Sequence, residues 1–301
     1  CIHTRGLHAF CLYNLVFETA QHSSFPPTGG IAFVHANCSW YIPPRIAMAE
    51  YAALMENEGR IHIVELKDEV VKHKGLGVLN IETLLTDVEV GEEVLVGQKY
   101  LTRMPTRLPE LIAGMARRAQ TISAKDAGSF ITRLGVGSGD TVLEAGLGSG
   151  GLSLHLARVL GSSGHLVTAE PRTEHADVGL LNLERAEKCF AEFPKHTHLE
   201  GMVEDVVPDL EFEAIILDMP VHRPAILACA PKLAFGGRIA CYAPTTSQLE
   251  DCWKSCEEAG LVVEWAGELM ERQWSPTSKG GMRPVNGPFG HTAFLLFAQK
   301  R

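Results

Sequence analysis

The chain has 301 residues, of which 46% are hydrophobic and 21% are charged, a composition typical of a globular protein with one large domain or one domain and a smaller one. Its apolar runs are shorter than the ~20 residues that a membrane-spanning helix needs, which excludes a membrane-spanning protein. The formal net charge of −9, from 27 basic and 36 acidic residues, argues against a uniformly basic nucleic-acid-binding surface but allows a local basic groove.

The eight cysteines do not form a disulfide framework in a chain of this length, and they include neither a CxxC pair nor a Cys/His cluster with zinc spacing. We therefore predict no metal site. Cys252 and Cys256 lie four residues apart on an expected helix and are interpreted as buried thiols, and His196 and His198 as residues of a strand edge. Free thiols indicate a reducing compartment, so we expect a cytoplasmic protein.

The first 47 residues differ from the rest of the chain. They contain only three charged residues, Arg5, Glu18 and Arg45, far below the chain average of 21%. From Met48 the composition changes abruptly and resembles the start of a protein. We expect the native protein to begin near Met48 and residues 1–47 to be non-native or an upstream extension, with a signal peptide or a genuine extension as the alternatives.

Residues 60–100 alternate apolar and polar side chains, and glycines interrupt them at short intervals. This pattern predicts a small N-terminal β domain, which we place at 48–104. Residues 105–301 are then expected to form the main domain.

A helix is expected after Pro105 and Pro109, which break the chain, and it carries Leu111, Ile112 and Met115. Beyond it, strands and helices alternate at the spacing of a parallel sheet. Strands are expected at 140–145, 164–170, 197–203, 212–218 and 236–243. Helices are expected at about 151–160, 175–192, 223–233 and 246–259.

The last of these helices has a capping-box pattern, with Glu250 three residues after Ser247. Two final strands, at about 261–271 and 291–299, are joined by a Gly/Pro-rich loop without a helical crossover, so they are expected to pair antiparallel. The predicted fold is a Rossmann-like α/β sheet with an antiparallel C-terminal hairpin, preceded by the small β domain.

The strongest chemical signal is a hydrophobic strand that turns through glycines into a helix, with the spacing Gly146-x-Gly148-x-x-Gly151. Glycines there let a ligand approach the backbone closely. Glu170 ends the next strand 24 residues after Gly146, where an acid binds the ribose of a nucleotide cofactor. This pattern fits both NAD and S-adenosylmethionine, and a glycine turn without a ligand is the third alternative.

Three features favour S-adenosylmethionine. Glu144 precedes the first glycine by two residues and suits a cationic amino-acid group better than a pyrophosphate. Asp205 follows the third strand, where it could accept from an adenine amino group. The antiparallel end of the sheet differs from the all-parallel dinucleotide-binding fold.

From about Tyr100 to Lys300 the sequence resembles the tRNA (adenine-N1)-methyltransferases of bacteria and archaea. These enzymes modify the T-loop adenine at tRNA position 58, and archaeal members also act on the neighbouring position 57. The resemblance is carried by RRAQTISAKDAG at 117–128, VLEAGLGSG at 142–150, IILDMP at 215–220 and GHTAFL at 290–295. It implies a class I methyltransferase fold, S-adenosylmethionine as cofactor, tRNA as substrate and a homotetramer.

The resemblance also implies roles for individual residues. The cofactor would be bound by Glu144, by the loop of Gly146, Leu147, Gly148, Ser149 and Gly150, and by Glu170, His175, Asp205 and Asp218. Asp218 would also face the target adenine, and Gln120 would line the active site with it as a second catalytic residue. The family commonly has tyrosine where Ser123 stands, which puts an aromatic contact to the base in doubt, and threonine where Leu147 stands.

The chemistry of the acceptor supports a role for Asp218. Adenine N1 has an in-plane lone pair that can attack a sulfonium methyl group without prior deprotonation, and the product ring is a cation. A carboxylate that accepts from the N6 amine orients the base and stabilises the developing charge. Val221 follows Pro220, where adenine-N6 enzymes usually have an aromatic residue, and this counts against N6 chemistry.

Residues 99–135 carry seven basic and two acidic side chains, which predicts an RNA-facing surface within an acidic protein. We expect Arg117, Arg118 and Lys125 to contact the substrate. Arg283 and His291 belong to a final loop that resembles the closing motif of the family, and they are further substrate candidates. A purely structural His291 is an equal alternative.

Three other functions remain open from the sequence. The first is methyl transfer from S-adenosylmethionine to a protein carboxylate or a small molecule. The second is a non-catalytic tRNA-binding partner subunit, which is disfavoured because such a subunit is expected to lose the glycine loop. The third is an NAD oxidoreductase, for which the sequence offers no His–Asp acid/base pairing.

Overall fold

The computed structural model describes residues 50–285 and 290–301. The expected start near Met48 and the expected extension at 1–47 lie outside the described residues. No helix in the described part of the chain is long and apolar enough to cross a membrane.

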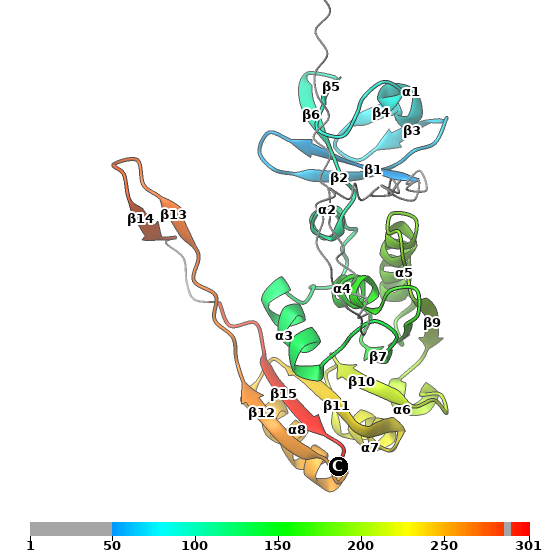
Figure 1. Ribbon diagram of the computed structural model, residues 1–301, viewed down its shortest axis with the longest axis vertical. Helices are drawn as coiled ribbons and strands as arrows, with labels where there is room; N and C mark the ends of the chain where they lie inside the picture. The colour runs from blue at the N-terminus through cyan, green and yellow to red at the C-terminus, as the bar shows by residue number, and fades with distance from the viewer. Residues whose placement is uncertain (1–49, 286–289) are drawn as a thin grey trace, which may run out of the picture. The chain divides into compact units, whose positions relative to one another are not determined.

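The first elements form a four-stranded antiparallel sheet in the order β2-β1-β6-β5 (Figure 1). Its strands are β1 (Tyr51–Glu56), β2 (Ile61–Glu65), β5 (Glu93–Val96) and β6 (Lys99–Met104). The β3–β4 hairpin (Val70–His73 and Gly77–Asn80) and the short helix α1 (Ile81–Leu85) lie between β2 and β5 in the sequence. Leu54, Val64 and Leu101 are buried in the small core. The boundary at residue 104 stays a prediction.

The main sheet has seven strands in the order β12-β15-β11-β10-β7-β8-β9. They are β7 (Thr141–Ala145), β8 (His165–Glu170), β9 (Lys195–Glu200), β10 (Phe212–Leu217), β11 (Leu233–Ala243), β12 (Val262–Gly267) and β15 (Phe294–Gln299). The strands from β7 to β11 pair in parallel, and β15 pairs antiparallel with both β11 and β12. The predicted Rossmann-like sheet with an antiparallel end is confirmed.

Helices cover both faces of this sheet (Figure 1). One core is shared by α2 (Leu108–Gly114), α3 (Ala124–Leu134), α4 (Gly151–Leu160) and α5 (Thr173–Glu187). The opposite core is shared by α6 (Val203–Val206), α7 (Arg223–Cys229), the 3₁₀ turn Ala230–Lys232 and α8 (Thr246–Glu258). Cys252 and Cys256 are fully buried on α8, which confirms their interpretation as core thiols, and His196 and His198 lie on the edge strand β9.

Several expected boundaries were wrong, each for a local reason. The strand expected at 197–203 ends at Glu200, because Gly201 adopts a φ of +136° and α6 follows. The N-cap of α8 is Thr245, which is extended and accepts from Gln248 N, so Gln248 and not Glu250 completes the capping box. Ser247 already lies inside that helix.

Some elements were not predicted at all. Residues 124–134 form α3, although the sequence around them was read only as a motif. The expected loop between the last two strands contains a hairpin of β13 (Trp274–Pro276) and β14 (Met282–Pro284). Gly280 and Gly281, both with positive φ, allow its tight turn.

Candidate functional site

A cleft of about 380 Å³ lies at the carboxyl ends of the central parallel strands, where open α/β sheets bind ligands. Small-molecule pockets span roughly 300–1,000 Å³, so its size suits a nucleotide-sized ligand. Its walls are the glycine loop after β7, the segment 119–122, the turn 218–220 after β10, and side chains that follow β8, β11 and the hairpin. Among the described residues, no group of three or more His, Cys, Asp or Glu could hold a metal ion.

The glycine loop forms the floor of this cleft. Gly146, Gly148 and Gly150 all have positive φ, at +93°, +52° and +77°, and α4 begins directly after them. The Leu147 side chain is buried below the loop, so this residue offers the cleft mainly its backbone. The threonine that the family commonly has at this position is therefore not needed to keep the loop in place.

Glu144 borders the cleft from inside the sheet and is almost fully buried. Ser153 Oγ donates to its Oε2 at 2.6 Å. Burial, together with the nearby negative charge of Asp218, raises the pKa of Glu144 to about 8 against the opposing effect of the Ser153 hydrogen bond. A carboxyl group in this state gains most from a cation placed beside it.

Asp218 follows β10 and lies directly beside the start of the glycine loop. Its backbone N–H donates to the carbonyl oxygen of Ala145 at 2.9 Å, which fixes the turn to β7. Burial raises the pKa of Asp218 to about 6, while the positive charges of His222 and Arg172 oppose this shift. Asp218 is therefore an anion at neutral pH in a site that shields it from water.

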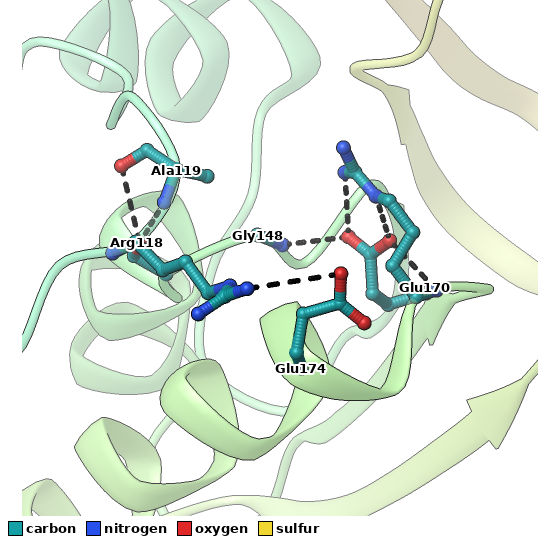
Figure 2. Close-up of polar contacts among 7 residues, drawn as sticks. Arg118, Ala119, Gly148, Glu170 and Glu174 are labelled. Atoms are coloured by element: carbon teal, nitrogen blue, oxygen red, sulfur yellow. Dashed lines mark hydrogen bonds and ion pairs between the residues drawn. The ribbon is translucent and has the colours of Figure 1, made fainter.

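Glu170 ends β8, and its side chain is fully buried (Figure 2). It accepts from Gly148 N at 3.0 Å and from Arg172, through the backbone N at 3.2 Å, Nε at 2.7 Å and Nη2 at 3.1 Å. Burial by itself raises the pKa of Glu170, but these hydrogen bonds outweigh it and hold the pKa below its usual value. Glu170 is a charged acceptor at the ribose-binding position of the fold.

The segment that carries Gln120 is tied to the glycine loop. Ser149 Oγ accepts from the backbone N–H groups of Arg118 and Ala119, each at 3.0 Å, and donates to the Ala119 carbonyl oxygen at 3.1 Å. Asn182 of α5 binds both backbone groups of Ala116 and the Ser149 carbonyl oxygen. Gln120 therefore lines the cleft from a rigid support, and the Ser149 side chain serves this support.

The basic segment 99–135 does not form one continuous basic surface. Lys125 Nζ donates to Asp126 Oδ1 and to Thr292 Oγ1, each at 2.7 Å, and Lys99 pairs with Glu56. The Arg133 guanidinium lies 4.0 Å from the centre of a Trp265 ring, and Arg103 donates to the carbonyl oxygens of Leu85 and Val88. These four cations are therefore engaged within the protein.

Arg117 and Arg118 are exposed beside the cleft. Arg117 Nη2 donates to the carbonyl oxygen of Ile112, and Arg118 approaches Glu174 of α5 at 4.0 Å (Figure 2). Substrate contacts by these two residues and by Lys125 stay predictions. Of the three, Lys125 is the least available to a phosphate, because its ammonium group already donates to Asp126 and Thr292.

Nine expected contact residues lie outside the residues that line the cleft: Gly150, Glu170, His175, Asp205, Arg117, Arg118, Lys125, Arg283 and His291. Asp205 is exposed on α6, and Arg283 is exposed on the β13–β14 hairpin. His291 Nδ1 contacts Glu268 Oε2 at 2.8 Å and its Nε2 contacts the Pro244 carbonyl oxygen at 3.0 Å. These two contacts raise the pKa of His291, and its role as a substrate contact stays a prediction.

Several lining residues were not found from the sequence: Arg172, Met219, Tyr242, Gln248 and Thr292. Met219 and Thr292 lie within the motifs IILDMP and GHTAFL but were given no role, whereas Tyr242 and Gln248 lie outside the motifs. For Arg172 the sequence offered one signal, its position two residues after Glu170. A cation there lies at the mouth of the cleft that the expected ribose-binding acid marks.

The fold is that of the S-adenosylmethionine-dependent methyltransferases. A solved SAM-dependent O-methyltransferase from Thermotoga maritima is 27% identical and superposes with a TM-score of 0.69, covering 84% of this chain and 93% of that chain. The seven-stranded order and the cleft at the carboxyl ends of its strands define a class I methyltransferase domain.

Residues 103–279 match the family described as the tRNA methyltransferase complex GCD14 subunit, and the chain belongs to this family. The tRNA (adenine(57)-N(1)/adenine(58)-N(1))-methyltransferase TrmI of Methanocaldococcus jannaschii is 28% identical over 84% of this chain and 95% of its own length. The tRNA (adenine(58)-N(1))-methyltransferase TrmI of Thermus thermophilus is 30% identical over 81% of this chain and 94% of its own length.

Proposed function

We propose that the protein transfers a methyl group from S-adenosylmethionine to N1 of the T-loop adenine at position 58 of tRNA. The observation that carries this proposal is the placement of the anionic Asp218 against the glycine loop, within one cleft at the carboxyl ends of β7 and β10. Membership of the tRNA methyltransferase family supports the choice of substrate.

The residues of the cleft fit the cofactor. The buried Glu144 suits its cationic methionine part, and the backbone of the glycine loop accommodates the same part closely. Glu170, which is paired with the cleft-lining Arg172, suits the ribose hydroxyls. Asp205 is proposed for the adenine and His175 as a further cofactor contact, although neither is among the residues that line the cleft. When bound, the cofactor supplies an electrophilic methyl group.

The chain's own residues then have to hold and polarise the acceptor base. A carboxylate at Asp218 accepts a hydrogen bond from the N6 amine of adenine, which orients N1 and stabilises the positive charge that develops on the ring. No general base is needed, because the N1 lone pair is free. Gln120 lines the same cleft and is proposed as a second contact to the base.

The target adenine lies in a folded tRNA and must be extruded from its stack, at a cost of a few kcal/mol. Phosphate contacts have to supply much of that energy. Arg117 and Arg118 are proposed for these contacts because both are exposed at the cleft. Arg283 on the hairpin is proposed as a more distant one.

We further propose that the enzyme is a homotetramer in the cytoplasm. The hairpin and its flanks carry the exposed apolar side chains of Met270, Trp274 and Met282, which suit contact with a second copy of the chain. Five cysteines among the described residues are free thiols, which fits a reducing compartment. Native mass spectrometry tests the tetramer, and a monomer at micromolar concentration would contradict it.

The test of the function uses the full chain, methyl-labelled S-adenosylmethionine and an unmodified tRNA transcript, with labelled nucleosides mapped by mass spectrometry. We expect 1-methyladenosine at position 58. A transcript with guanine at position 58 should remain unlabelled there, and label at 57 in the wild-type transcript would extend the specificity to the neighbouring position.

Two outcomes would overturn the proposal. Label in a protein carboxylate or small molecule, and not in tRNA, would assign the other methyl acceptor. Failure of calorimetry to detect S-adenosylhomocysteine binding would remove the cofactor itself.

A further inference from the structure

The Glu170 carboxylate is fully occupied as a hydrogen-bond acceptor. It accepts two bonds from backbone N–H groups, of Gly148 and Arg172, and two from the Arg172 guanidinium. A carboxylate offers about four lone-pair sites. A new donor can therefore reach Glu170 only if one of the present donors leaves.

The donor that can leave is the guanidinium. The Gly148 N–H belongs to the glycine loop, and the Arg172 N–H belongs to the N-cap residue of α5, so both are held by the backbone. The Arg172 side chain is 55% exposed and lines the cleft, whereas the Glu170 side chain is fully buried. Two ribose hydroxyls that bind Glu170 would displace the guanidinium and leave the backbone donors in place.

A displaced guanidinium would remain in the cleft mouth. Besides Glu170, the negative charges of Glu174 and Asp218 act on this guanidinium and raise its pKa. Glu174 is already approached by Arg118, and Asp218 faces the acceptor side of the cleft. The planar fork of arginine matches the oxygens of a phosphate in two simultaneous hydrogen bonds.

We propose that Arg172 is a phosphate-binding residue that becomes available only when the cofactor ribose occupies Glu170. Its ligand is a backbone phosphate of the RNA strand that carries the target adenine. This inference rests on the proposed function, because it takes the ribose of the cofactor and tRNA as the two ligands. It goes beyond that function by making Arg172 the physical link between them.

The link has a defined thermodynamic consequence. If the cofactor raises the affinity for RNA by some factor, RNA raises the affinity for the cofactor by the same factor. The enzyme would therefore favour binding of tRNA after the cofactor and would hold RNA weakly when no methyl donor is present. RNA would then bind mainly to protein that already holds the methyl donor and can methylate it.

The first test measures binding of an unmodified tRNA transcript with and without saturating S-adenosylhomocysteine, across a series of salt concentrations. In the wild-type protein we expect the product to tighten tRNA binding about tenfold and to steepen the salt dependence by about one phosphate contact. In Arg172→Ala both effects should vanish. Arg118→Ala is the matched control, since it should weaken tRNA binding equally in both states.

The second test needs no RNA. Calorimetry of S-adenosylhomocysteine should show about fivefold tighter binding to Arg172→Ala than to the wild-type protein, because the competing ion pair is gone. Circular dichroism confirms that the variant is folded. Unchanged or weaker binding would overturn the displacement of Arg172 by the ribose.

The two proposals fail in different ways. A wild-type protein that methylates tRNA but binds it equally well with and without S-adenosylhomocysteine refutes the link alone. Persistent coupling in Arg172→Ala likewise refutes it. A wild-type protein that binds no S-adenosylhomocysteine refutes the proposed function and the link together.

Discussion

Gly146 lies so close to Asp218 that a Cβ atom on Gly146 would be 1.9 Å from the Asp218 carbonyl oxygen. The Asp218 N–H also donates to the carbonyl oxygen of Ala145. The start of the glycine loop and the turn that carries the acceptor-side carboxylate are therefore in direct backbone contact. The spacing between the two halves of the cleft is set by this contact.

We predict that Gly146→Ala separates these halves. The Cβ clash and the positive φ of +93° together should cost about 3 kcal/mol of stability or more, and methylation should fall below detection. Gly91→Ala is the matched control, because Gly91 has a similar φ of +98° and no described atom within 4 Å of the added Cβ. It should cost about 1–2 kcal/mol and leave activity intact. Equal losses in both variants, measured by urea unfolding, would show that backbone strain and not the contact matters.

Asp218→Ala should abolish most turnover but preserve cofactor binding. Loss of a group that stabilises transition-state charge costs about 10²-fold or more in rate. Single-turnover methylation measures the rate, and calorimetry with S-adenosylhomocysteine measures binding. Asp87→Ala, at an exposed carboxylate of the small β region, should match the wild type in both. Near-normal turnover of Asp218→Ala would discard the role.

The rate should also follow the ionisation of Asp218. Burial raises the pKa of Asp218 to about 6, and only the ionised form carries the negative charge that stabilises the cationic ring. We expect the single-turnover rate to be full above this pKa and to fall as the pH drops through it. Asp218→Asn should lose this limb of the profile, and a wild-type rate that stays constant between about pH 5 and 8 would contradict the assignment.

Glu144 should make the cofactor-free protein less stable as the pH rises. Burial raises its pKa from 4.5 to about 8, so between these values the native state holds a proton that the unfolded state has released. The free energy of unfolding therefore decreases with rising pH across this window. Urea unfolding of Glu144→Gln should show a shallower decrease than the wild type. Asp218 contributes in the same direction over a lower range, so some slope should remain in the variant.

Gln248 should matter for the rate through the turn that carries Asp218. Its Oε1 accepts from Thr245 in the capping box, and its Nε2 donates to the Pro220 carbonyl oxygen at 3.1 Å. Gln248→Glu keeps the acceptor and loses the donor, so we expect kcat to fall about tenfold with a change in stability below about 1 kcal/mol.

Thr245→Ala is the complementary change. It removes the cap and leaves the bond to Pro220, so it should lower stability by about 1 kcal/mol with kcat unchanged. If both variants lower kcat in proportion to their stability, Gln248 acts only through α8.

The parts of the site that the sequence predicted are local. A strand, a glycine turn and a helix follow one another within 142–160, and Glu170 ends the next strand. The hydrophobic periodicity and the residue types of the turn are therefore sufficient to locate this part of the site. The antiparallel end of the sheet was also accessible, because connection length restricts strand direction. The roles given to these residues stay predictions.

The rest of the site depends on contacts between distant segments. Tyr242, Gln248 and Thr292 reach the cleft from three elements, and the partner of Lys125 at Thr292 is 167 residues away. A count of charges in one segment gives no information on such partners. For this reason the basic segment 99–135 looked more available to RNA in the sequence than it is in the structure.

The position of β15 between β11 and β12 has a consequence for synthesis on the ribosome. Every residue of the cofactor loop is translated before residue 160, but β12 has no neighbour in the main sheet until residues 294–299 have emerged. A chain that stops within this strand would leave the edges of β11 and β12 unpaired, and unpaired apolar edges promote aggregation. Late nonsense mutations should therefore deplete the protein through quality control, even though they remove none of the cofactor-binding residues.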